Sequence, residues 1–96
     1  MSLPDFSPRA VADLDEILAF VARDKPLAAV KFVGKLKDRC RLLADFPEMG
    51  TRRDDLMSGL RASSIGNYVI YYRPIESRVR IERVLHAARD VDALFG

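Results

Sequence analysis

The segments Tyr68-Val-Ile-Tyr-Tyr-Arg73 and Arg83-Val-Leu-His-Ala-Ala-Arg-Asp90 decide how this chain folds. Both are rich in β-branched and aromatic residues, which favour strands on a half-buried sheet. Gly66-Asn67 stands just before the first segment and follows another β-prone run at residues 60–65. Glycine at the first of two turn positions suits a type II′ hairpin turn. The sequence therefore predicts a β-hairpin that ends in a row of cationic side chains.

A third strand is predicted at residues 79–85, after a short loop that begins where Pro74 ends the middle strand. The alternation of apolar and polar residues in this third strand fails at Arg83, which stands where an apolar residue is due. Two interpretations remain open. Either a β-bulge shifts the register at Arg83, or its guanidinium lies on the same face of the sheet as Ile81.

Two amphipathic helices precede these strands. Ser7-Pro8 matches an N-cap followed by proline at the first helical position, and apolar residues then recur three and four apart as far as residue 22. Pro26 can open a second helix, which stops before Pro47. A short strand at residues 3–6 is expected at a sheet edge, because Pro4 cannot donate a backbone hydrogen bond.

The predicted fold class is therefore α+β, in the order β-α-α-β-β-β. An αα-hairpin packs on a small antiparallel sheet with an N-terminal edge strand, which makes a two-layer domain over residues 1–96. A chain of this length can bury roughly 60% of the surface that it exposes when unfolded, so it can fold without disulfides.

Composition limits the classes of function. The chain is 49% hydrophobic and 31% charged, which is typical of a soluble globular domain. The N-terminus lacks the profile of a signal peptide, and the longest apolar run, residues 17–22, is too short to cross a bilayer, so we expect a cytoplasmic protein. Cys40 is the single cysteine, which excludes an internal disulfide and a multi-cysteine metal site.

Charge is distributed unevenly along the chain, although the net charge is only +2. Residues 10–22 carry acidic groups and no basic ones, whereas residues 25–41 are strongly basic. Lysine is absent after residue 41, so every permanent cation there is an arginine, which pairs well with carboxylates and phosphates. This favours an anionic partner for the C-terminal half.

Several short motifs follow one another along the chain: Ser7-Pro8, Ala12-Asp-Leu14, Ala28-Ala29, Phe32, Pro47, Gly50, Asp55-Leu56, Gly59-Leu-Arg61, Tyr68-Val-Ile-Tyr-Tyr-Arg73, Arg83-Val-Leu-His86 and Arg89-Asp90. Their order and spacing resemble the RelE/ParE superfamily of type II toxin-antitoxin toxins, and more closely its ParE branch. The resemblance implies a helical hairpin on a small antiparallel sheet, with the first strand beside the last. It also implies a toxin that poisons DNA gyrase and is held inactive by a cognate ParD-like antitoxin.

Other branches of this superfamily are ribosome-dependent mRNA endonucleases, which gives an alternative function. Cleavage of RNA without a metal needs a base, an acid and cations. The candidate groups are His86, Tyr71 or Tyr72, Glu48 or Glu82, and Arg61, Arg83 and Arg89, and no sequence pattern brings them together. The nuclease branches tend to end in basic and aromatic residues, whereas this chain ends Asp92-Ala-Leu-Phe-Gly96. We therefore expect no catalytic residue, cofactor or metal, and a diverged copy that has lost toxicity is a third hypothesis.

Cationic and aromatic residues of the predicted strands are the candidates for binding the antitoxin or the target: Arg61, Tyr72, Arg73, Arg80, Arg83 and Arg89. Internal pairing of Arg61, Arg73 and Arg83 with acidic residues of the same chain is an equally open interpretation. The lysines of the second helix are interpreted as a solvated face, so neither direct nucleic-acid binding nor membrane association is expected.

Overall fold

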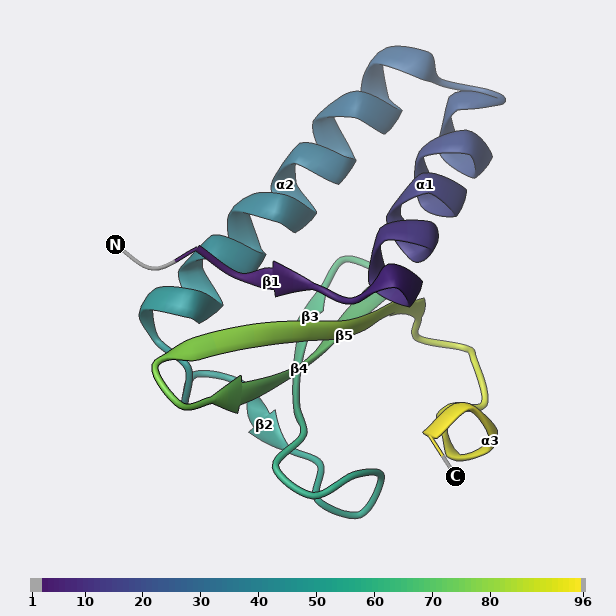
Figure 1. Cartoon of the computed structure of the whole chain (residues 1–96). Helices are drawn as coiled ribbons and strands as arrows, with labels where there is room; N and C mark the ends of the chain where they lie inside the picture. The colour runs from purple at the N-terminus through teal and green to yellow at the C-terminus, as the bar shows by residue number, and fades with distance from the viewer. Residues whose placement is uncertain (1–2, 96) are drawn as a thin grey trace.

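The computed structural model describes residues 3–95, so Met1, Ser2 and Gly96 of the predicted 1–96 domain lie outside the described part. Its elements in chain order are β1 (Asp5–Phe6), α1 (Pro8–Ala22), α2 (Pro26–Asp45), β2 (Thr51–Arg52), β3 (Arg61–Ile65), β4 (Tyr68–Ile75), β5 (Arg78–His86) and α3 (Val91–Phe95). The strands form one five-stranded sheet in the order β1-β5-β4-β3-β2. Figure 1 shows α1 and α2 side by side as a hairpin over the sheet, with α3 away from them near the C-terminus. The predicted α+β class is confirmed.

Helix α1 begins where Ser7 and Pro8 predict. The Ser7 hydroxyl accepts a hydrogen bond from the backbone N–H of Ala10 at 3.0 Å and donates one to the carbonyl of Glu82 at 2.7 Å. Ser7 thus satisfies an otherwise unpaired amide of the first helical turn and ties the start of α1 to β5. The inner face of α1 buries Ala10, Leu14 and Ile17.

Helix α2 supplies the larger part of the helical contribution to the core. Leu36, Cys40 and Leu43 have no exposed surface, and they pack with α1 against residues of β4 and β5 such as Ile70 and Ile81. Burial without a charged partner raises the pKa of the Cys40 thiol to about 12, although Arg41 and Arg39 oppose the rise. Cys40 is therefore a core residue, as its place in the helical pattern predicts.

The strand boundaries differ from the prediction at two places. β4 continues through Pro74 to Ile75, with Pro74 opposite Val79. β3 begins at Arg61, opposite Tyr72, so within the described residues β5 is the one strand that pairs with β4 at Pro74, where the missing N–H is tolerated. A strand that the sequence did not predict, β2, lies between α2 and β3 and pairs with β3 through Thr51 and Arg52.

A β-bulge interrupts the pairing of β4 with β5. Tyr72 lies opposite Ile81 and Tyr71 lies opposite Arg83, so Glu82 is the extra residue. Of the two interpretations left open at Arg83, the structure therefore shows the β-bulge, with the extra residue one position before Arg83. Because of the inserted residue, Ile81 and Val84 both enter the core beneath the helices.

A second, smaller cluster covers part of the other face of the sheet. Leu60, Tyr71 and Leu85 are buried there beneath the 56–57 segment and α3. The ring of Phe95 lies 5.2 Å from the ring of Tyr71 between centroids, which holds α3 on the sheet. Within the described residues, no helix has both the length and the apolar character needed to span a bilayer.

Candidate protein-binding surfaces

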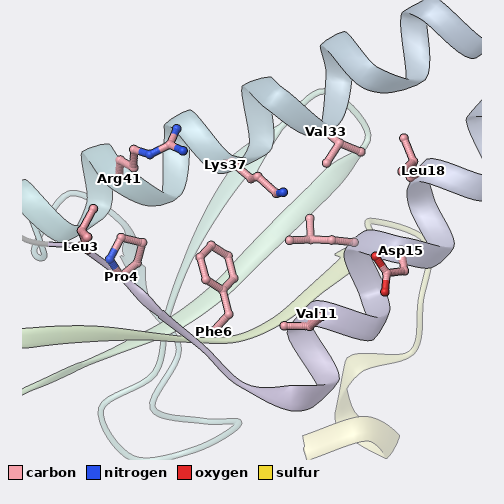
Figure 2. Close-up of a pocket in the computed structure, with 10 residues that line it drawn as sticks. Leu3, Pro4, Phe6, Val11, Asp15, Leu18, Val33, Lys37 and Arg41 are labelled. Atoms are coloured by element: carbon pink, nitrogen blue, oxygen red, sulfur yellow. The ribbon is translucent and has the colours of Figure 1, made fainter.

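An open apolar groove lies between α1, α2 and the N-terminal edge strand. It encloses about 420 Å³. The residues that line it, which we call the helix-hairpin groove, are Leu3, Pro4, Phe6, Val11, Leu14, Asp15, Leu18, Val33, Lys37 and Arg41. Figure 2 shows that Phe6 comes from β1, that Val11 and Leu18 come from α1, and that Val33, Lys37 and Arg41 come from α2.

The groove is apolar at its floor and predominantly basic at its rim. Leu14 and Val33 are buried at its base, whereas Val11 is 47% exposed. Lys37 and Arg41 face one acidic residue, Asp15, across the opening (Figure 2). An extended or helical segment with apolar anchors and acidic flanking residues fits this arrangement.

Arg73 and Arg80 form a cationic pair on the face of the sheet opposite the helix hairpin. They lie opposite each other on β4 and β5, and both bind the carboxylate of Glu82, at 2.7 Å from Arg73 Nε and 3.3 Å from Arg80 Nε. The Arg73 and Arg80 side chains are 33% and 39% exposed, so both remain within reach of a partner. One carboxylate between two guanidiniums leaves a net positive charge here.

Arg83 is instead bound within the chain. Its Nε and Nη2 donate to the two carboxylate oxygens of Asp13 at 2.8 and 3.0 Å, and Asp13 also accepts the backbone N–H of Val84 at 2.9 Å. The bidentate hydrogen bonds to Asp13 raise the pKa of the Arg83 guanidinium. Its side chain is only 14% exposed, and Arg83 therefore links α1 to β5.

Tyr72 and Arg61 hold the turn that follows α2. Tyr72 is fully buried; its hydroxyl donates to the carbonyl of Pro47 and accepts the N–H of Gly50, both at 2.8 Å. Burial is the main reason that the pKa of the Tyr72 hydroxyl is raised. Arg61 donates to the carbonyls of Gly50 at 2.7 Å and Glu48 at 3.2 Å. Tyr72 is therefore placed where no partner can touch it without rearrangement.

Arg89 lies in a separate place, beyond the end of β5. It lines a hollow with Phe20, Tyr68 and His86, and within the described part of the chain its side chain makes no ion pair. The His86 ring packs edge-on against Tyr68 with centroids 5.2 Å apart, and its Nδ1 accepts the N–H of Ala88. The six predicted residues thus occupy four distinct environments and do not form one cluster.

The candidate groups for RNA cleavage lie in more than one place, with Tyr72, Arg61 and Glu48 together at the turn after α2. Glu82 is engaged by two arginines, the Tyr72 hydroxyl by two backbone groups and His86 by Ala88, while Glu48 lies on the turn after α2. Among residues 3–95, no three His, Cys, Asp or Glu side chains gather in a group that could hold a metal ion. Glu82, Tyr72 and His86 thus each have a partner within the chain, whereas the Glu48 carboxylate forms no ion pair in the described part of the chain.

The helix hairpin, the small sheet and the parallel β1–β5 edge define a fold of the RelE/ParE toxin class. A solved structure described as "Chromosomal ParDE TA system from P. aeruginosa" matches with a TM-score of 0.76, over 90% of this chain and 96% of that one. At 21% identity this match establishes the shared fold.

The sequence comparisons define the family. The model for the ParE toxin of the type II toxin-antitoxin system parDE matches residues 5–91, and the chain belongs to that family. It is 33% identical to Toxin ParE1 of Caulobacter vibrioides over 94% of both chains. It is also 36% identical to Toxin RelE2 of the same organism, over 84% of this chain and 90% of that protein.

Proposed function

We propose that this ParE-family toxin poisons DNA gyrase by binding it, without catalysis, and that a ParD-like antitoxin neutralises the toxin. Family membership supports the class of toxin. The observation that favours binding over catalysis is that three of the candidate acids and bases, Glu82, Tyr72 and His86, are each engaged by a group of the same chain. An action on gyrase places the toxin in the cytoplasm.

The helix-hairpin groove is the proposed antitoxin site. Its apolar floor and its Lys37 and Arg41 rim match a segment that orders on binding and carries apolar anchors between acidic residues. Arg73 and Arg80 supply further cations on the other face of the sheet, where an acidic antitoxin that wraps around the domain would meet them.

Purified toxin and gyrase test the target. The expected result is loss of supercoiling activity with accumulation of linear DNA. Normal supercoiling with no linear product would remove gyrase as the target.

Co-expression with the cognate antitoxin tests the groove. Val11→Glu should weaken antitoxin binding at least tenfold, because it places a carboxylate on the apolar wall facing acidic flanks. Leu27→Glu is the matched control, since Leu27 is 81% exposed and lies outside the groove lining. Equal binding by both variants would exclude this groove.

The similarity to Toxin RelE2 supports one alternative, ribosome-dependent mRNA cleavage. It predicts that expression of the toxin halts translation first and produces discrete breaks in ribosome-bound message. Intact message together with an early DNA-damage response would reject it. Harmless overexpression without an antitoxin would instead indicate a diverged, inactive copy.

A further inference from the structure

A second apolar hollow lies at the C-terminal end of α2, where it meets the base of the β4–β5 turn. Figure 1 shows this end of α2 beside that turn, at the opposite end of the helix from the α1–α2 connection. The hollow spans about 870 Å³ and is wide open to solvent. The residues that line it, which we call the Phe46 surface, are Leu42, Asp45, Phe46, Pro47, Glu48, Met49, Arg61, Pro74 and Glu76.

The Phe46 surface exposes large apolar side chains together. Phe46 is 60% exposed, Met49 47% and Leu42 41%. Single exposed hydrophobic residues are normal on a folded protein, but several around one hollow are typical of an interaction site. An aromatic ring and a methionine are also the side chains most often enriched where proteins bind proteins.

The turn that carries these side chains is held rigidly. Tyr72 and Arg61 together make four hydrogen bonds to backbone groups of Pro47, Glu48 and Gly50. A Cβ atom at Gly50 would stand 2.5 Å from the Tyr72 hydroxyl, so the turn packs directly on the sheet. A preorganised surface loses little conformational entropy when a partner binds.

The charges around the Phe46 surface are the reverse of those around the helix-hairpin groove. Asp45, Glu48 and Glu76 line it, and in the described part of the chain none of their carboxylates forms an ion pair. Arg61 is the one basic residue of the lining, and it is engaged by backbone carbonyls. An acidic antitoxin segment would be repelled here, and a second copy of the toxin would bring acidic rim against acidic rim.

We propose that the Phe46 surface docks the toxin's target, a protein that presents an apolar side chain flanked by lysine or arginine. This inference rests on the proposed function, because it assigns a surface to the target that the function requires. The two surfaces adjoin on α2, where Arg41 lines the groove and Leu42 lines the Phe46 surface. An antitoxin in the groove therefore hinders a large target sterically without occupying its docking surface.

Phe46→Ser and Met49→Ser test the proposal, with Leu27→Ser as the matched control. All three side chains are largely exposed, so thermal unfolding should change little. We expect Phe46→Ser and Met49→Ser to raise the toxin concentration needed for linear DNA to accumulate with gyrase by at least tenfold. Leu27→Ser should act as wild type, and antitoxin affinity should be unchanged in all three variants.

A charge variant and a growth assay separate the possible failures. Glu48→Lys combined with Glu76→Lys should weaken gyrase poisoning in the purified assay most at low salt, because it reverses the charge of the rim. If wild type poisons gyrase and Phe46→Ser poisons it equally, the surface is wrong and the target stands. If the wild-type toxin does not act on gyrase, a growth assay replaces the gyrase assay. Growth arrest by Phe46→Ser equal to that by wild type overturns the assignment of the Phe46 surface. Loss of growth arrest in Phe46→Ser supports the Phe46 surface as the docking site for a target other than gyrase. A wild-type chain without any toxicity overturns both proposals.

Discussion

Replacing Asp13 by alanine should destabilise this domain more than any change on its surface. Asp13 is 6% exposed, and its carboxylate accepts three hydrogen bonds, two from Arg83 and one from the backbone of Val84. Without it, a guanidinium that is 14% exposed and a buried amide both lose their partner. Removing one member of a buried ion pair costs about 3–5 kcal/mol. Because Arg83 also lines a hollow open to solvent, water can partly rehydrate it, and we take the lower value, about 3 kcal/mol.

Urea unfolding followed by circular dichroism measures this cost. For a domain of this size, about 3 kcal/mol corresponds to a melting temperature lower by roughly 12–24 °C. Asp15→Ala is the control, because Asp15 is exposed on the same helix and should change stability by less than about 0.5 kcal/mol. In a double-mutant cycle with Arg83→Met, the double variant should lose at least about 1 kcal/mol less than the sum of the single losses. Equal losses for Asp13→Ala and Asp15→Ala, or strict additivity, would refute the structural role of the pair.

Four further predictions concern helix α2, the turn that follows it and the core. Gly50→Ala should destabilise by about 1–3 kcal/mol, because its Cβ would meet the Tyr72 hydroxyl at 2.5 Å. Gly34→Ala should stabilise by about 0.5–1 kcal/mol, since nothing lies within 4 Å of its Cβ on the helix, and chemical denaturation of both variants checks the opposite signs. Tyr72→Phe should cost about 1–3 kcal/mol and reduce toxicity, because it frees the turn that carries Phe46; unchanged unfolding would contradict this. The Cys40 thiol should react with a disulfide reagent only when the domain unfolds. Its contribution to stability is present at neutral pH and should fall as the pH rises from about 9 towards about 12, because over that range the thiol ionises in the unfolded chain but not in the folded one.

The helices and the meander could be predicted because local chemistry and the global fold agree. Ser7 and Pro8 fix the start of α1, Pro26 fixes the start of α2, and Gly66 adopts the positive φ of 58° that the hairpin turn needs. The bulge could be predicted only as one of two interpretations, since the break in alternation at Arg83 fits either a shifted register or a guanidinium on the face of Ile81. The pairing of β4 with β5 decides between them.

Features that depend on distant partners could not be predicted in the same way. β2 consists of two exposed residues and has no apolar alternation, so only its pairing with β3 reveals it. Pro74 was expected to end β4. The sequence does not show that β3 begins only at Arg61, so that one edge of β4 is unpaired at Pro74.

The candidate binding residues show the same limit. The chemistry of Arg83 indicated an acidic partner, but Asp13 lies 70 positions earlier in the chain, too far for a sequence pattern to pair the two residues. The helix-hairpin groove was missed because Phe6, Val11 and Val33 come from three elements, and each looks like an ordinary core position in its own pattern. Phe46 and Met49 gave a detectable signal, because they are apolar residues next to or near Pro47, where the second helix was predicted to stop.

The pairing of β1 with β5 also affects the order in which parts of the domain can fold during synthesis. Asp5 and Phe6 find their only strand neighbours at Arg80 and Ile81, so the wall of the groove that contains Phe6 waits for nearly the whole polypeptide to be synthesised. In the proposed antitoxin site, the wall that contains Phe6 is complete only after Arg80 and Ile81 have been synthesised. This topology favours recognition of the folded domain over capture of the nascent chain.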